Sequence, residues 1–239
     1  MAYVPRLYLP GHVALGPLML DAGAAHRLAA VMRLRAGDRF LVFSGDGREW
    51  AATVSSVEKN RLHASVSGVT RTRAQLPLIV ECWCSVVRPN RFDWAIEKCT
   101  EAGVDVFRPL VTEHSARGET PSVNREERWE RLAVEAAEQS GRLSVPVIAP
   151  SATFERLLEQ AGGTLIVFDR DGRSWQEAVT LIPEQGRVSL AIGPEGGLSA
   201  AEIAAAKAHG ALVVSLGPNI LRTETAAAAG VVLIRSLGR

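Results

Sequence analysis

Cysteine and histidine are scarce in this sequence of 239 residues. The chain has three cysteines and five histidines, and the histidines are scattered without the spacing of metal ligands. Three cysteines cannot make a paired disulfide framework. Two of them, Cys82 and Cys84, stand in an apolar run that is typical of buried, unreactive thiols. We therefore expect neither a disulfide scaffold nor a metal site.

Long apolar runs are also missing. The longest wholly apolar stretch lies around residues 226–234, which is far too short to cross a bilayer. The first six residues do not show a basic segment followed by an apolar one, as a secretion signal would. We therefore expect a cytoplasmic protein. A hydrophobic content of 47% indicates a globular chain with a substantial core.

Neither sign of charge is in excess over the whole chain, whose formal net charge is +1. The two ends of the chain nevertheless differ. Residues 1–73 carry ten basic and five acidic side chains, whereas the remainder carries 17 basic and 21 acidic ones. A basic front segment joined to a mildly acidic body would attract a polyanion to the front.

The basic front segment has the pattern of a small, mostly β module. Gly45-Asp46-Gly47 is a hairpin turn signal between two strand-like runs, and a third run alternates in the same way. A short amphipathic helix is predicted between Asp21 and Met32. We expect a barrel-like domain over residues 1–73 and a second domain over residues 74–239. The expected strands are residues 39–43, 49–57 and 61–69.

From Pro77 onward, apolar runs of strand length alternate with helical patterns. This alternation predicts the α/β class, with a mostly parallel sheet covered by helices. One helix is especially clear, because Trp129, Ala133 and Ala137 recur at helical spacing. The expected strands are residues 78–86, 104–110, 145–148, 164–168, 188–192 and 211–216.

A glycine-rich segment, Ile-Gly-Pro-Glu-Gly-Gly-Leu-Ser over residues 192–199, follows one of these strands. We call it the first signature loop. Ser199 and Glu202 form a capping-box pattern that predicts a helix directly after it. A loop at the carboxyl end of a strand in an α/β sheet is a common ligand site, and glycines let backbone groups approach a ligand closely. The alternative is a tight strand-to-helix turn that only needs positive φ. The pattern is neither GxGxxG nor a P-loop, so it does not indicate a dinucleotide or a nucleoside triphosphate.

A second such segment, Leu-Gly-Pro-Asn-Ile-Leu-Arg-Thr-Glu-Thr-Ala over residues 216–226, also leaves a strand and enters a helix. We call it the second signature loop. Two ligand-competent loops at neighbouring strand ends weaken the purely structural interpretation of each. Glu224 falls where the positive end of a helix dipole would stabilise a carboxylate. Arg222 stands among apolar residues at the helix entrance, and its alternative role is an ion pair with Glu224 or Glu195.

The two signature loops together resemble the paired signature of the RsmE family, whose members methylate N3 of a uridine in 16S rRNA and belong to the SPOUT methyltransferases. Asn219 departs from the family pattern, where a basic residue is expected, and His114 stands in a segment that usually reads Glu-Arg-Ser. Both departures concern local RNA contacts rather than the chemistry. Further segments that agree with the family are residues 31–38, 94–104 and 136–142.

The resemblance implies a fold and a cofactor. The front domain would be a PUA-like RNA-binding barrel, and the second domain would be a SPOUT α/β domain with a trefoil knot. General topology rules argue against a knot, so only the resemblance predicts it. Family members hold S-adenosylmethionine (SAM) bent in the knot and are homodimers, for which the apolar helix at residues 226–237 would be a docking surface. The implied cofactor-binding residues are Phe168, Gly193, Gly196, Gly197, Leu216, Gly217 and Leu221.

The implied reaction assigns roles to two charged residues. Uridine N3 carries an imide proton that must leave before the nitrogen can attack a methyl group, so a cation near O2 or O4 should stabilise the developing anion. Arg222 is our candidate for that cation. Glu195 is the second catalytic candidate, since it could accept a proton or position the base. Its alternative role is to shape its own loop by accepting backbone N–H groups, which we favour slightly.

The implied partner is 16S rRNA of the small ribosomal subunit. Arg6, Arg33 and Arg35 in the basic front segment are expected to contact phosphates. Lys98 and Arg142 are further candidate RNA contacts, and a solvent-exposed side chain is the alternative for Arg33, Arg35 and Arg142. Two other functions compete with this interpretation. One is a non-catalytic RNA-binding or ribosome-assembly factor, and the other is a methyltransferase that acts on a transfer-RNA ribose or on a different base.

Overall fold

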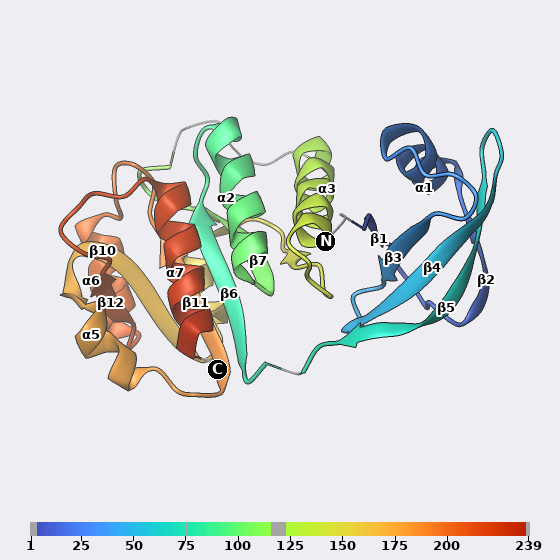
Figure 1. The fold of residues 1–239 in the computed structure, drawn as a ribbon. Coiled ribbons are helices and arrows are strands. Elements are labelled where there is room, and N and C mark those ends of the chain that lie inside the picture. The colour runs from blue at the N-terminus through green and yellow to red at the C-terminus, as the bar shows by residue number, and fades with distance from the viewer. Residues whose placement is uncertain (1–3, 75, 116–122, 238–239) are drawn as a thin grey trace. The chain divides into compact units, whose positions relative to one another are not determined.

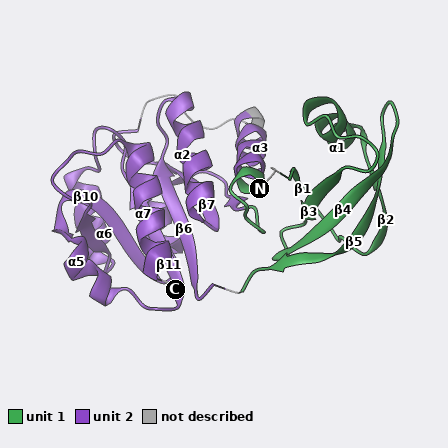
Figure 2. Ribbon diagram, viewed as in Figure 1, with its two compact units in different colours: residues 1–75, 137–145 green, residues 76–136, 146–239 purple. Residues whose placement is uncertain are grey.

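The structure is a computed structural model that describes residues 4–74, 76–115 and 123–237. The chain divides into two compact units (Figure 2). Unit 1 contains residues 1–75 and 137–145, and unit 2 contains residues 76–136 and 146–239. The predicted boundary lay between residues 73 and 74. No sequence pattern indicated that residues 137–145 group with the front of the chain.

Unit 1 is built on a five-stranded sheet of order β1-β3-β4-β5-β2 (Figure 1). β1 is parallel to β3, and the other neighbours are antiparallel. The predicted hairpin is confirmed as β3 and β4, with Gly45 and Gly47 at φ of 88° and 83° in its turn. The strands are β1 (Arg6–Tyr8), β2 (Gly16–Leu20), β3 (Arg39–Phe43), β4 (Arg48–Val57) and β5 (Leu62–Thr72).

The predicted front helix is confirmed as α1 (Ala22–His26), which continues into a π-helical turn (Arg27–Val31). The Asp21 carboxylate caps it by accepting the Ala24 N–H at 2.9 Å. Leu28 projects from the turn into the apolar core of unit 1 and is completely buried there. Other buried members of this core are Phe40, Val42, Ala52, Leu62 and Val66.

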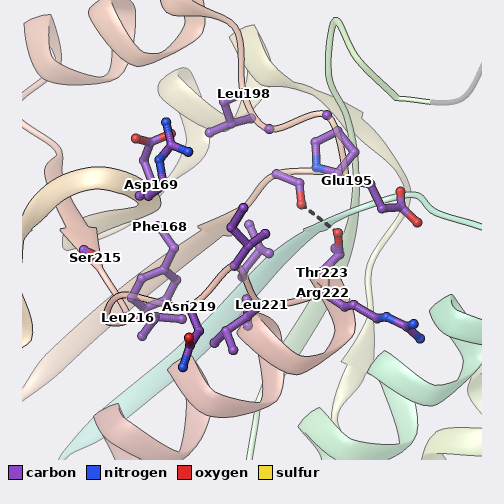
Figure 3. Close-up of a pocket in the computed structure, with 18 of the residues that line it drawn as sticks. Phe168, Asp169, Glu195, Leu198, Ser215, Leu216, Asn219, Leu221, Arg222 and Thr223 are labelled. Atoms are coloured by element: carbon purple, nitrogen blue, oxygen red, sulfur yellow. Dashed lines mark hydrogen bonds between the residues drawn. The ribbon is translucent and has the colours of Figure 1, made fainter.

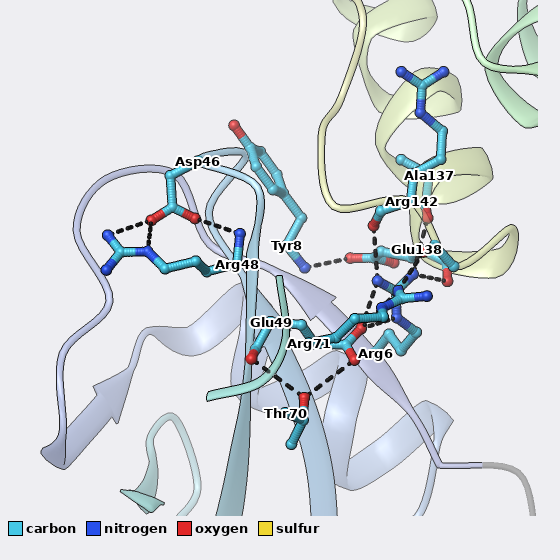
Figure 4. A network of polar contacts seen from close by, with 11 residues as sticks. Arg6, Tyr8, Asp46, Arg48, Glu49, Thr70, Arg71, Ala137, Glu138 and Arg142 are labelled. Atoms are coloured by element: carbon cyan, nitrogen blue, oxygen red, sulfur yellow. Dashed lines mark hydrogen bonds and ion pairs between the residues drawn. The ribbon is translucent and has the colours of Figure 1, made fainter. Parts of the chain in front are cut away.

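Arg6 on β1 lies at the centre of a polar network within unit 1 and is only 8% exposed (Figure 4). Its Nε and Nη2 atoms lie 2.9 and 2.7 Å from Glu49 Oε1. Its Nη1 atom donates to the carbonyls of Ala137 and Glu138 at 3.0 and 2.8 Å. Its Nη2 atom also donates to the Arg142 carbonyl at 2.7 Å. The donors of this guanidinium are thus already bonded to protein oxygens.

The Arg6 network completes the end of helix α3 (Val123–Gln139), whose last carbonyls have no partner inside the helix. A guanidinium at this end also interacts favourably with the helix dipole. The prediction that Arg6 contacts an RNA phosphate is therefore wrong. Counting charge along the sequence could not show that this arginine is buried against a segment more than a hundred residues away.

Unit 2 is built on a seven-stranded sheet in which every pairing between described strands is parallel, as predicted. The order is β12-β10-β11-β6-β7-β8, and β9 pairs with β7 beside this path. The strands are β6 (Leu78–Ser85), β7 (Val106–Val111), β8 (Val147–Ile148), β9 (Ala152–Thr153), β10 (Thr164–Ser174), β11 (Gly186–Ile192) and β12 (Leu212–Ser215).

Helices cover this sheet on both faces. Helices α2 and α7 pack together over it, and α7 contacts β6 and β11 (Figure 1). Successive residues of β11 face opposite layers, because Leu190 lies near Gly230 of α7 whereas Ala191 joins an apolar cluster with α4 and α6. Besides α3, the helices are α2 (Pro89–Ala102), α4 (Phe154–Gln160), α5 (Trp175–Ala178) with a 3₁₀ turn (Val179–Leu181), α6 (Ala200–Ala208) and α7 (Thr223–Leu237).

The capping box predicted after the first signature loop is confirmed at the start of α6. Ser199 Oγ accepts the Glu202 N–H at 3.2 Å, and the Glu202 carboxylate accepts the Ser199 N–H at 2.8 Å. Among the described residues, no helix is both long enough and apolar enough to span a membrane.

Replacing Arg6 with alanine tests the structural role of this network. We expect Arg6→Ala to lower the free energy of unfolding by about 3 kcal/mol, because buried Glu49 keeps only the longer contacts to Arg71 and Thr70 and the carbonyls at the end of α3 lose their donor. Urea denaturation followed by circular dichroism measures the change. The exposed residue Arg35 provides the control, since Arg35→Ala should change stability by less than about 0.5 kcal/mol. Equal stabilities of the two variants would contradict the assignment.

Candidate active site

The carboxyl ends of three adjacent parallel strands form a pocket of about 460 Å³ in unit 2 (Figure 3). Phe168 of β10 is in register with Ile192 of β11 on one side and with Val214 of β12 on the other. Because β11 and β12 end beside Phe168, where residues 169–172 bulge out of β10, the three segments that follow this level converge at one edge of the sheet.

All seven residues predicted to bind the cofactor line this pocket. So do both catalytic candidates, Arg222 and Glu195. The lining comes from three segments, which are residues 168–171, residues 192–198, and residues 215–217, 219–223 and 226.

The pocket offers apolar walls, backbone polar groups and a few charges. Gly197 and Gly217 have φ of 72° and 114°, so the backbone turns there in a conformation that favours glycine. Residues 169–172 bulge out of β10, where its register with β12 shifts, and the Asp169 carboxylate accepts the Asp171 N–H at 2.9 Å in this bulge. Apolar side chains on the wall are Phe168, Ile192, Leu198, Leu216, Ile220 and Leu221. This combination suits a small organic ligand that has both apolar and hydrogen-bonding parts.

The wall formed by Phe168 depends on a glycine in α7. A Cβ atom at Gly230 would lie 2.5 Å from Phe168 Cε2 and 3.3 Å from Leu190 Cδ1. Glycine in the middle of a helix normally costs stability. Here it lets α7 approach the ring closely enough for the ring to close one side of the pocket.

Side chains from two other segments contact backbone carbonyls at the two ends of the first signature loop. The Thr223 hydroxyl at the start of α7 donates to the Gly193 carbonyl at 3.0 Å. His114, which follows β7, places Nδ1 3.1 Å from the Gly197 carbonyl. Within the loop, the Gly197 N–H donates to the Pro194 carbonyl at 2.9 Å. The loop is therefore held at both ends before any ligand arrives.

Arg91 contacts the centre of the same loop, and sequence reasoning missed it. This residue lies in the first turn of α2, and its Nη1 atom is 2.6 Å from Glu195 Oε1. Its Nε atom is 4.0 Å from Oε1 of Glu224, a buried residue in the first turn of α7. A basic residue in the first turn of a helix opposes the helix dipole, and that was the only signal in the sequence.

The ion pairs differ from both sequence-based alternatives. Arg222 is exposed and forms no ion pair with the described residues, so its predicted alternative partnership with Glu224 or Glu195 is wrong. Among the described residues, the Glu195 carboxylate accepts from Arg91 and from no backbone N–H, so the predicted loop-shaping role is wrong. Arg91 instead takes both carboxylates, and Arg222 remains at the pocket wall.

The predicted RNA contacts do not line the pocket. Arg33 and Arg35 are exposed in unit 1, and Arg33 adopts φ of 61°. Lys98 on α2 has its Nζ atom 2.7 Å from Glu97 Oε1 and 2.8 Å from Glu101 Oε1. Its hydrogen bond to Glu101, and to a smaller extent the one to Glu97, raises the pKa of the lysine. Arg142 is half-buried, and its Nε atom donates to the Ser144 carbonyl at 3.1 Å.

The cysteines lie inside unit 2, as expected. Cys82, Cys84 and Cys99 are free thiols with no exposed surface. The interaction with the Cys99 thiol, together with burial, raises the pKa of Cys82, and burial raises the pKa of Cys84. In the part of the chain that the structure describes, no three acidic, histidine or cysteine side chains gather as metal ligands would.

Two family profiles match the chain. A profile of an RNA methyltransferase domain matches residues 74–235, and a profile of an RNA methyltransferase PUA domain matches residues 20–67. Ribosomal RNA small subunit methyltransferase E of Synechocystis is 34% identical over 99% of this chain and 78% of its own length. The Bacillus subtilis protein of the same name is 30% identical over 84% of this chain and 82% of its own length.

Solved structures agree with these sequence relatives. The crystal structure of ribosomal RNA small subunit methyltransferase E from Neisseria gonorrhoeae bound to SAM has a TM-score of 0.87 and 27% identity. A methyltransferase from Legionella pneumophila in complex with SAM also has a TM-score of 0.87, with 28% identity. Each comparison covers 98% of both chains. The signature loops, the PUA-like front domain and the parallel sheet thus lead to one conclusion: this chain belongs to the RsmE family of RNA methyltransferases.

Proposed function

We propose that this protein uses SAM to methylate N3 of a specific uridine in 16S rRNA. The observation that carries the proposal is the pocket at the ends of β10, β11 and β12, which gathers every predicted cofactor residue and Arg222. The named relatives support the substrate, and the SAM-bound structures support the cofactor. Because the proposed substrate is ribosomal RNA, we also propose a cytoplasmic location.

The residues present fit SAM. The volume of about 460 Å³ falls within the range of small-molecule sites. The apolar side chains of Phe168, Leu216 and Leu221 would cover the adenine and its neighbours, and backbone groups of Gly193–Gly197 would bond polar atoms. When bound, SAM supplies an electrophilic methyl group on a sulfonium. We also propose a trefoil knot in unit 2, on the strength of the match to the RNA methyltransferase family over residues 74–235.

The protein's own contribution to the reaction is to orient one uridine and to stabilise the charge that develops on it. N3 lies on the Watson–Crick edge, so the base must be unpaired or extruded to reach the pocket. Loss of the N3 proton to solvent water spreads negative charge onto O2 and O4, and N3 then takes the methyl group from SAM, which leaves S-adenosylhomocysteine. Arg222, exposed at the pocket wall and without an acidic partner among the described residues, would stabilise that charge. Glu195, held by Arg91, would position the base rather than remove its proton.

Single-turnover methylation tests the function and the role of Arg222 together. Purified protein with labelled SAM and small-subunit RNA should produce 3-methyluridine in a nucleoside digest. Arg222→Ala should lower the rate by about 100-fold or more, because the stabilising cation is lost where charge develops. Its affinity for SAM, measured by calorimetry, should stay close to that of the natural protein. A variant that methylates as fast as the natural protein would overturn the role assigned to Arg222, and absence of 3-methyluridine from both reactions would overturn the function.

We further propose that unit 1 contacts RNA phosphates through Arg33 and Arg35. Both side chains are exposed, and Arg33 keeps a left-handed backbone conformation that normally favours glycine. Lys98 and Arg142 stay weaker proposals, because protein acceptors already contact both.

The salt dependence of RNA binding tests these phosphate contacts. In an Arg33→Ala/Arg35→Ala variant, the slope of log affinity against log salt should become shallower by about 0.7 to 0.9 for each lost contact. Fluorescence anisotropy at several salt concentrations measures the slope. The same slope in variant and natural protein would count against both contacts.

We also propose that the protein is a homodimer that docks through α7. Val232 of α7 is 53% exposed and Trp94 of the neighbouring helix α2 is 42% exposed, which leaves apolar surface on this helix pair. Sedimentation equilibrium of the natural protein distinguishes a dimer from a monomer.

A further inference from the structure

Arg91 has a place in the site that neither signature loop assigns. The residue belongs to α2 and does not line the pocket, yet it contacts Glu195, which does. Its side chain is 30% exposed and its contact to Glu195 is 2.6 Å, so this is a close ion pair at the rim. The same guanidinium lies 4.0 Å from Glu224. The Arg91 guanidinium therefore lies beside two carboxylates.

The second carboxylate explains why a cation is needed at this place. The Glu224 side chain is only 9% exposed, and its Oε2 atom is buried without a hydrogen-bond partner among the described residues. Burying a carboxylate without a cation is costly. Among the described residues, Arg91 provides the recorded ion-pair contact to this group. The start of α2 is thus tied electrostatically to the start of α7.

Arg222 stands close to both acids in the fold. It precedes Glu224 by two residues, and it shares the pocket wall with Glu195. Figure 3 shows the side chains of Glu195 and Arg222 extending toward the same side of the pocket. An arginine in this position would be attracted to either carboxylate. Among the described residues it forms an ion pair with neither, whereas Arg91 is 2.6 Å from Glu195 and 4.0 Å from Glu224.

We propose that Arg91 is a positioning residue that keeps Arg222 available to the substrate by holding Glu195 and Glu224. This inference rests on the proposed function of Arg222. Without Arg91, the exposed carboxylate of Glu195 would turn to Arg222 and neutralise it. The Glu224 carboxylate would reach Arg222 less easily, because it is buried in the first turn of α7. Arg91 therefore acts through another residue and does not touch the substrate.

A role in which Arg91 only braces the first signature loop predicts a different outcome. Replacing Glu195 distinguishes that role from the protection of Arg222. If Arg91 only braces the loop, then Arg91→Ala and Arg91→Ala/Glu195→Gln lack the same brace and should be equally slow. If Arg91 keeps Glu195 away from Arg222, then removing the Glu195 carboxylate should restore the contribution of Arg222 to methylation in the double variant. Thr223 and His114 still hold the loop at Gly193 and Gly197 in both variants.

The experiment compares single-turnover methylation by the natural protein, Arg91→Ala, Glu195→Gln and the double variant. We expect Arg91→Ala to be slower than the natural protein by about tenfold or more, because Arg222 is captured. Glutamine at position 195 keeps a side-chain oxygen that can contact the base but carries no charge to capture Arg222. The double variant should therefore recover at least about fivefold over Arg91→Ala and match Glu195→Gln within about threefold, the non-additivity expected of coupled residues. Calorimetry should give an affinity for SAM within about fivefold of the natural protein for all three, since the loop ends stay held.

Two further variants control for folding. Arg91→Lys keeps the charge and should retain more activity than Arg91→Ala, which gives a test if the alanine variant unfolds. Arg128→Ala removes another ion pair on α2, the 2.6 Å contact with Asp93, and should leave methylation unchanged. A double variant no faster than Arg91→Ala, or an Arg91→Ala protein as fast as the natural one, would overturn the inference. Failure of the natural protein to methylate would instead overturn the proposed function.

Discussion

The site depends on the parallel pairing of β10 with both β11 and β12. This pairing fixes Phe168, Ile192 and Val214 at one level, so the three loops that follow must leave the sheet at the same edge. No single loop would make a pocket by itself. The register of three strands brings two glycine-rich segments and a short acidic turn together around one pocket. The chemistry then needs only a few side chains beyond these loops.

Contacts from outside the sheet keep these loops in place. Thr223 and His114 hold the ends of the first signature loop, and Arg91 holds its centre. Glycine at position 230 lowers the stability of α7 as a helix, but it lets the helix pack closely against Phe168, whose ring lines the pocket. A site prepared in this way spends little binding energy on ordering itself when a ligand arrives.

Most of the fold and the pocket could be predicted from local patterns. Strand-length apolar runs, the Gly45-Asp46-Gly47 turn and the capping box at Ser199 depend on neighbouring residues, and each is confirmed. What failed depends on partners distant in sequence. Arg6 looked like a surface cation until its burial against the end of α3 was seen. Arg91 lies 104 residues from Glu195, and no periodicity connects them.

Hydrogen exchange with and without SAM tests the central claim, that three strand ends build one prepared cofactor site. The account predicts that SAM slows amide exchange in residues 168–171, 192–198 and 215–223 together, since all three segments line the pocket. It also predicts that the first signature loop already exchanges slowly without SAM, because its ends are held. Protection confined to one segment, or exchange that SAM leaves unchanged in all three, would contradict the account.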